Sequence, residues 1–120
     1  MALLDKIIWQ TETMLGEAIT LELLSDRCAV SPYHIYRVFQ QGMGMSIMSY
    51  VRGRRLSIAA RAITDCDEIL LNVAIDAGYA SHEAFTRAFA GCFGELPSTV
   101  RTARSVSPLS LLEPLKMKKI

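Results

Sequence analysis

The chain has 120 residues, enough for one ordinary domain or two very small ones and too few for a large multidomain enzyme. Hydrophobic residues make up 51% and charged residues 21%, a balance typical of globular domains and too apolar for a disordered tail. The formal net charge of +1 gives no indication of a polyanionic partner.

The sequence favours a reduced, cytoplasmic protein. Its three cysteines lack the C-x-x-C spacing of zinc and disulfide motifs, and Cys28 and Cys92 fit small core positions while Cys66 fits a turn. The N-terminus does not resemble a secretory signal, and polar residues interrupt every apolar stretch well short of 18 residues. We therefore expect no membrane segment, no metal and no cofactor.

Apolar residues recur at intervals of three and four, which predicts helices throughout and no strand. Serine or threonine stands at the expected helix starts, where its oxygen can cap free N–H groups, and Pro32 and Pro97 suit a first turn. The expected helices cover about 3–15, 20–28, 31–42, 46–64 and 67–78, with two more starting at 81 and 97.

A shift of 50 residues superimposes the second half of the chain on the first. The identical pairs are Ser31 and Ser81, Arg37 and Arg87, Phe39 and Phe89, Gly44 and Gly94, and Arg54 and Arg104. Each half reads as a short helix, a tight turn and a second helix, the helix-turn-helix arrangement. We expect an all-α domain over 1–104, made of a first unit at about 3–45, a linker helix at about 46–64 and a second unit at about 67–104. Residues 105–120 are expected to form a C-terminal tail or a linker.

The second helix of each half has one apolar and one polar face. The apolar faces contain Ile35, Val38 and Phe39 in the first half, and Phe85, Ala88 and Phe89 in the second. The polar faces contain Tyr33, Tyr36, Arg37 and Gln40 in the first half, and His82, Glu83, Thr86 and Arg87 in the second. A helix-turn-helix places its second helix in the major groove of double-stranded DNA, where arginine can grip guanine and threonine can contact a base edge or a thymine methyl.

The spaced pattern of the second half resembles the defining sequence of the AraC/XylS family of transcription regulators. The matching residues are Ala74, Gly78, Tyr79, Ser81, Phe85, Arg87, Phe89, Phe93, Gly94, Pro97 and Arg101. The first half resembles its counterpart through Ser31, Arg37, Val38, Phe39, Gly44, Ser46, Tyr50, Val51, Arg52, Arg54, Arg55 and Leu56. The resemblance covers about residues 19–104, and the chain is similar in particular to the MarA, SoxS and Rob group.

That resemblance implies seven helices in two helix-turn-helix subdomains joined by a long linker helix, and no enzymatic activity. It also implies binding as a monomer at an asymmetric DNA site, with two helices in successive major grooves. From the two helix-turn-helix units and their exposed arginines we expect a sequence-specific transcription regulator, an activator that recruits RNA polymerase. The residues assigned to base contacts are Tyr33, Tyr36, Arg37, His82, Glu83, Thr86 and Arg87. Those assigned to phosphate contacts are Ser31, Gln40, Arg52, Arg54, Ser81 and Arg101.

Several alternatives remain open at this point. Glu83 either accepts a hydrogen bond from cytosine N4 or complements the helix dipole, and Tyr33 and Tyr36 either contact DNA or pack at a helix edge. Ala90 and Leu96 depart from the family pattern, where lysine and a capping serine or threonine are usual. The alternative function is a DNA-binding fragment that binds weakly alone and is controlled by an absent companion domain, through which alone a small-molecule effector would act.

The near-zero net charge conceals a strong segregation of charges along the chain. Residues 1–30 carry −3, residues 31–62 carry +5, residues 63–100 carry −5 and residues 101–120 carry +4. No acidic residue occurs in 31–62, whereas Arg87 is the only basic residue in 63–100. We therefore expect DNA affinity to depend mainly on the first half, with the second half contributing chiefly specificity.

Overall fold

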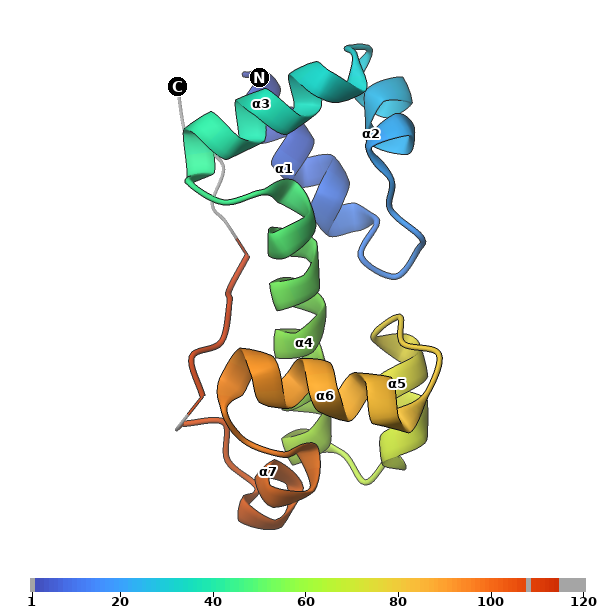
Figure 1. The fold of residues 1–120 in the computed structure, drawn as a ribbon, viewed down its shortest axis with the longest axis vertical. Helices are drawn as coiled ribbons and strands as arrows, with labels where there is room; N and C mark the ends of the chain where they lie inside the picture. The colour runs from blue at the N-terminus through green and yellow to red at the C-terminus, as the bar shows by residue number, and fades with distance from the viewer. Residues whose placement is uncertain (1, 108, 115–120) are drawn as a thin grey trace. The chain divides into compact units, whose positions relative to one another are not determined.

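The structure is a computed structural model that describes residues 2–107 and 109–114 (Figure 1). Its helices are α1 (Leu3–Thr13), α2 (Leu21–Cys28), α3 (Pro32–Met43), α4 (Ile47–Asp65), α5 (Leu70–Asp76), α6 (His82–Phe93) and α7 (Pro97–Ala103). No strand occurs in these described ranges, and the seven helices confirm the predicted all-α fold.

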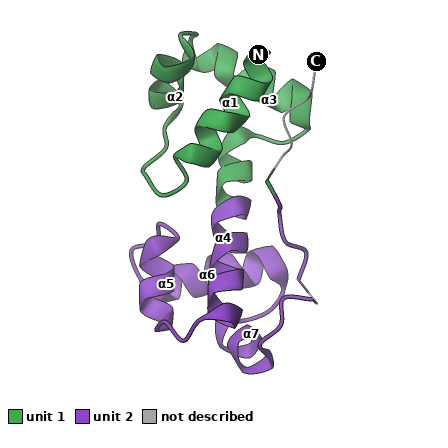
Figure 2. Ribbon diagram, turned by 180° about the vertical axis from the view of Figure 1, so that it is seen from behind, with its two compact units in different colours: residues 1–52, 114–120 green, residues 53–113 purple. Residues whose placement is uncertain are grey.

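The chain divides into two compact units inside α4, as the colours of Figure 2 show. The first unit contains α1 to α3 and α4 as far as Arg52, and the second unit contains Gly53 to Glu113. The predicted domain end at Arg104 therefore does not describe the packing, because the described residues between Ser105 and Glu113 belong to the second unit.

Local sequence signals set the helices of the first unit. Thr20 accepts a hydrogen bond from the Leu23 N–H at 3.0 Å, and Ser31 accepts one from the His34 N–H at 3.1 Å, so both predicted N-caps are confirmed. At the other end of α3, Gly44 takes φ +75°, a left-handed conformation that favours glycine.

The three helices of the first unit pack on one another around a closed apolar core. Its buried side chains are Ile7, Ile8, Met14, Ile19, Leu24, Cys28, Ile35, Phe39, Ile47, Tyr50 and Val51. At the start of α4, the ring of Tyr50 lies 5.5 Å from that of Phe39, and its hydroxyl donates a hydrogen bond to the Glu12 carboxylate. The polar end of this buried tyrosine is therefore satisfied.

The second unit repeats the same local design. Ser81 accepts a hydrogen bond from the Ala84 N–H at 3.1 Å, and Gly94 ends α6 at φ +75°, the same angle as Gly44. The 50-residue sequence repeat is thus a structural repeat of capped helices. The buried side chains of this unit's core are Leu56, Ala59, Ala60, Ile63, Val73, Ala74, Ala77, Phe85, Phe89, Val100 and Leu109.

Helix α5 begins later than its sequence predicts. The prediction started it at Asp67, but the helix starts at Leu70. Asp67 instead pairs with Arg104 at 2.7 Å, and the Glu68 carboxylate accepts a hydrogen bond from the Asn72 side chain at 2.7 Å. The acidic residues before α5 are therefore engaged by other side chains and do not form its first turn.

The segment after α7 packs along the second unit instead of leaving it. Leu109 is buried in the core, and the Leu112 N–H donates to the Ser57 hydroxyl at 2.8 Å. A Cβ built on Gly53 would lie only 2.8 Å from Cδ2 of Leu112, and Glu113 pairs with Arg61. We call the described residues from Ser105 to Glu113 the C-terminal strap, because Leu109 packs into the core and Leu112 and Glu113 contact residues of α4.

Candidate nucleic-acid interface

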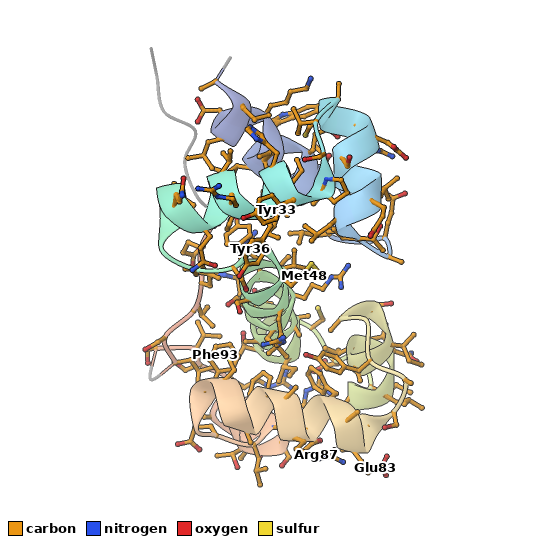
Figure 3. All side chains as sticks on the ribbon, turned by 45° about the horizontal axis from the view of Figure 1, so that its top comes forward. Tyr33, Tyr36, Met48, Glu83, Arg87 and Phe93 are labelled. Atoms are coloured by element: carbon orange, nitrogen blue, oxygen red, sulfur yellow. The ribbon has the colours of Figure 1, made fainter. Side chains whose placement is uncertain are left out.

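The outer face of α3 carries two exposed tyrosines and an exposed arginine. Tyr33 is 68% and Tyr36 43% exposed, and Arg37 is exposed beside them. The Arg37 guanidinium carbon lies 5.7 Å from the centroid of the Tyr33 ring, within the range of a cation–π contact. Figure 3 shows both tyrosines projecting from one side of α3.

This display follows from the buried side of the same helix. Ile35 and Phe39 are fully buried and Val38 is partly buried, as predicted for the core face. At 3.6 residues per turn, burying these positions turns Tyr33, Tyr36 and Arg37 outward. The helix thus presents hydrogen-bond donors and aromatic surface to solvent, in a segment of the chain without acidic residues.

Helix α6 displays its equivalent face by the same logic. Phe85 and Phe89 are fully buried, whereas His82, Glu83 and Arg87 are exposed. Glu83 and Arg87 stand one turn apart and project from the same side of α6 (Figure 3). No ion pair joins them within the described part of the chain, so both charges face solvent separately.

Two residues predicted on these faces are less accessible than expected. Thr86 is partly buried, and its hydroxyl oxygen is inaccessible and without a hydrogen-bond partner among the described residues. The predicted contact of Thr86 with a base therefore stays a prediction, and in this conformation the hydroxyl is not exposed for it. Gln40 is also partly buried, toward the C-terminal end of α3.

Of the six predicted phosphate-contacting residues, Ser31, Ser81 and Arg52 keep positions compatible with that role. Ser31 and Ser81 lie at the N-termini of α3 and α6, where the first N–H groups of a helix favour anions. Arg52 is exposed on α4. None of these three assignments is tested by the structure, and each stays a prediction.

Arg54 contradicts its predicted role. Its side chain is only 8% exposed, and Nη1 donates a hydrogen bond of 3.0 Å to the main-chain oxygen of Leu112. The C-terminal strap therefore covers this guanidinium, which rules out a phosphate contact in this conformation. The sequence pattern could not reveal this, because the covering residue lies 58 positions later.

Arg101 is engaged within the second unit. Its Nε donates to the oxygen of Ile63 at 3.2 Å and its Nη2 to the oxygen of Cys66 at 3.4 Å. These carbonyls belong to the end of α4 and the residue just beyond it, where carbonyl groups lack helical partners. Arg101 therefore closes the end of α4, in addition to any contact with phosphate.

The remaining sequence predictions gave mixed results. Cys28 is buried, as predicted, and burial raises the pKa of its thiol, whereas Cys92 is exposed and its predicted core position is wrong. The basic run at Lys116, Lys118 and Lys119 lies outside the described residues.

The described residues contain no cluster of three or more potential metal ligands, and none of their helices is long and apolar enough to cross a membrane. The contact between Tyr33 and Arg37 was not predicted from the sequence. Its signal was present, because an aromatic residue four positions before an arginine places the two on one helix face.

Comparison with known proteins identifies the fold family. A family model described as a helix-turn-helix domain matches residues 24–103. The chain is 37% identical over 98 residues to the HTH-type transcriptional regulator YbfP of Bacillus subtilis, covering 82% of this chain and 33% of that protein. It is 30% identical over 113 residues to the transcriptional regulator Rob of Salmonella typhimurium, covering 94% of this chain and 39% of Rob. The chain therefore spans between a third and two fifths of the length of these two relatives.

A shorter relative and two solved structures also match this chain. The multiple antibiotic resistance protein MarA of Escherichia coli is 29% identical over 104 residues, covering 87% of this chain and 82% of MarA. An AraC-type regulator from Chromobacterium violaceum superposes with a TM-score of 0.79 at 19% identity, over 86% of this chain and 92% of that one. The DNA-binding domain of AdpA, solved in complex with a target DNA, superposes with a TM-score of 0.73 at 26% identity, over 84% and 90% of the two chains.

These relatives and the fold are those of DNA-binding regulator domains, not of enzymes. The capped, repeated helix pairs described above and the match over residues 24–103 lead to the same assignment. The chain belongs to the AraC-type helix-turn-helix family of DNA-binding transcription regulators.

Proposed function

We propose that this chain recognises a specific, asymmetric DNA sequence by inserting α3 and α6 into successive major grooves. The observation that carries the proposal is the pair of exposed arginine-bearing faces, on α3 and on α6, each opposite the face that buries two side chains of the same helix completely. Arginine can bond guanine through two parallel hydrogen bonds, and a helix-turn-helix reads base edges with residues near the start of its second helix.

In this reading, Tyr33, Tyr36 and Arg37 contact bases from α3. His82 and Arg87 do so from α6, with Thr86 contributing its methyl group, and Glu83 lies beside Arg87 on the same exposed face. Arg52 and the capped starts of α3 and α6 at Ser31 and Ser81 hold phosphates. Arg54 is left out of this set because the C-terminal strap covers it. The first half supplies most of the attraction to phosphates, since residues 31–62 carry +5 and residues 63–100 carry −5.

The test is selection of binding sites from random duplex DNA, followed by sequencing. We expect one enriched motif with two conserved parts. Arg37→Ala and Arg87→Ala should each cost about 1–3 kcal/mol at the preferred site and relax base preference in one part only. Selection that enriches no sequence would refute the proposal.

Arg27→Ala is the matched control, since Arg27 is also an exposed arginine but lies in the last turn of α2. Removing its charge can weaken binding to all DNA through the salt-dependent term, but it should not change which bases are selected. A shift of base preference in this control would mean that the two reading faces are wrongly assigned.

We further propose that the chain binds as a monomer and activates transcription by recruiting RNA polymerase. The support is family membership together with the different charges of the two halves, since residues 31–62 carry +5 and residues 63–100 carry −5. Sedimentation of the DNA complex should give one chain per site, and transcription from a template bearing the selected motif should rise with added protein. A fall in transcription would mark a repressor.

The second candidate is a DNA-binding part that depends on a companion domain. It is favoured by the lengths of the relatives, of which this chain spans 33% and 39%, and by α7, which begins after Leu96 without a side-chain cap. Affinity for the selected motif separates the candidates: tight, specific binding by these 120 residues supports the first, and binding no tighter than to random DNA supports the second.

A further inference from the structure

The exposed arginines of α3 and α6 occupy equivalent positions of the repeat, but the residues one helical turn before them differ. Arg37 and Arg87 occupy equivalent positions 50 residues apart. The residue one turn earlier is Tyr33 on α3 and Glu83 on α6, and both are exposed. One arginine therefore stands beside an aromatic ring and the other beside a carboxylate.

The ring of Tyr33 restrains Arg37 without using any of its hydrogen-bond donors. The guanidinium lies 5.7 Å from the ring centroid, and a cation–π contact leaves the N–H groups at the edge of the guanidinium plane available. No acidic residue occurs between positions 31 and 62, so the charge of Arg37 is also not neutralised by its own segment. An arginine that is already oriented loses less conformational freedom when it meets a guanine.

Glu83 acts on Arg87 in the opposite direction. The carboxylate faces solvent one turn away, without an ion pair to Arg87 among the described residues. Any surface that receives Arg87 therefore also receives a negative charge, which phosphates repel. Only a site that offers Arg87 good hydrogen-bond acceptors compensates for this repulsion.

We propose that positions 33 and 83 determine how each reading arginine is used. Tyr33 is a positioning residue that holds Arg37 for base contact and so raises affinity, while Glu83 penalises binding of α6 to unmatched DNA and so raises specificity. The inference rests on the proposed function, because it assumes that both arginines meet DNA.

A double-mutant cycle tests the proposed role of Tyr33. Kd is measured on the selected motif for Tyr33→Leu, Arg37→Ala and the double variant. In the wild-type background, Tyr33→Leu should weaken binding about two- to fivefold more than it does in the Arg37→Ala background. This difference is the coupling expected of an exposed cation–π contact. Tyr33→Phe keeps the ring and should retain that coupling. If the effects of Tyr33→Leu and Arg37→Ala simply add, Tyr33 does not position Arg37.

Glu83→Gln tests the proposed role of Glu83, because this substitution removes the negative charge and keeps the shape of the side chain. Binding to an unmatched duplex should tighten about two- to threefold, as expected for one like charge removed at about 7 Å in water. The ratio of affinities for matched and unmatched DNA should fall. Weaker binding to the selected motif, with unmatched binding unchanged, would show that Glu83 reads a base directly and would overturn this proposed role.

The two levels of failure are distinguishable. If site selection enriches no motif, the proposed function itself fails. If a motif is enriched and bound, but the cycle is additive and Glu83→Gln leaves the affinity ratio unchanged, only this inference fails. Both side chains are exposed, so circular dichroism and thermal unfolding should report folded variants throughout.

Discussion

The guanidinium of Arg54 donates a hydrogen bond from Nη1 to the main-chain oxygen of Leu112, at 3.0 Å. This bond ties α4 to a segment that follows the last helix, and it leaves Arg54 only 8% exposed. A positive charge that the sequence analysis assigned to a phosphate contact is thereby engaged within the second unit.

Arg54→Ala should therefore lower the free energy of unfolding rather than weaken DNA binding. We expect a loss of about 1–3 kcal/mol, because a charged hydrogen bond is removed and the Leu112 oxygen loses this partner. Urea unfolding measures the loss, and the salt dependence of DNA affinity should keep its slope. The matched variant is Arg52→Ala, two positions earlier and exposed, which should reduce the slope by about one and leave stability unchanged. The opposite pattern in the two variants would return Arg54 to the phosphate contacts.

A pair of glycine variants tests the close approach of the C-terminal strap to α4. Gly91→Ala on α6 should stabilise the protein by about 0.5–1 kcal/mol, since the added Cβ meets nothing within 4 Å and alanine favours helix. Gly53→Ala should gain less, because its Cβ would lie 2.8 Å from Cδ2 of Leu112. In a Leu112→Ala background, Gly53→Ala should give the full gain in stability, as measured by thermal unfolding. Equal gains at both glycines in the wild-type background would argue against a packed strap.

Thr86→Val should stabilise the second unit by about 1 kcal/mol. The replaced hydroxyl is buried and has no hydrogen-bond partner among the described residues, and valine keeps the shape of the side chain. Denaturant unfolding gives the change in stability, and site selection should return an unchanged motif. Should the motif change at one base pair, the hydroxyl would have to reach DNA in a different rotamer.

Arg101→Lys separates a structural role of Arg101 from a phosphate contact. Lysine keeps the positive charge, but its single ammonium group lacks the separate N–H donors of the guanidinium that bond the main-chain oxygens of Ile63 and Cys66. The free energy of unfolding should therefore fall by about 1 kcal/mol. Affinity for DNA and its salt slope should stay the same. Unaltered stability together with weaker binding would mean that the guanidinium serves the phosphate backbone instead.

The three cysteines should differ in reactivity toward a thiol reagent such as N-ethylmaleimide. Cys66 and Cys92 are exposed, whereas burial raises the pKa of the Cys28 thiol above its ordinary value, so Cys28 should be modified last in the native protein. Mass spectrometry of timed samples gives the order. Rapid labelling of Cys28 under native conditions would contradict its burial.

The same raised pKa links Cys28 to stability in the alkaline range. The unfolded chain loses this proton at a lower pH than the folded chain, so the contribution of Cys28 is complete below the ordinary thiol pKa and decreases as pH rises above it. Urea unfolding at several pH values in that range measures the decrease in the free energy of unfolding. Cys28→Ala should remove the part of this pH dependence that comes from the Cys28 thiol.

The sequence by itself determined the local structure. Three capping residues, Thr20, Ser31 and Ser81, begin their helices where predicted, and the glycines at 44 and 94 end α3 and α6. Each of these signals acts within one or two helical turns. The alternation of apolar and polar positions likewise fixed which face of α3 and α6 is buried, and with it the exposure of Arg37 and Arg87.

Only the tertiary structure decided which of the predicted polar residues remain accessible. Arg54 is covered by Leu112 and Arg101 is bonded to carbonyls near position 65, contacts that span 58 and at least 35 residues. No periodicity of three or four residues carries information over such a separation. The path of the C-terminal strap likewise depends on distant residues, because Leu112 approaches Gly53 closely and bonds to Ser57, which lies 55 positions earlier.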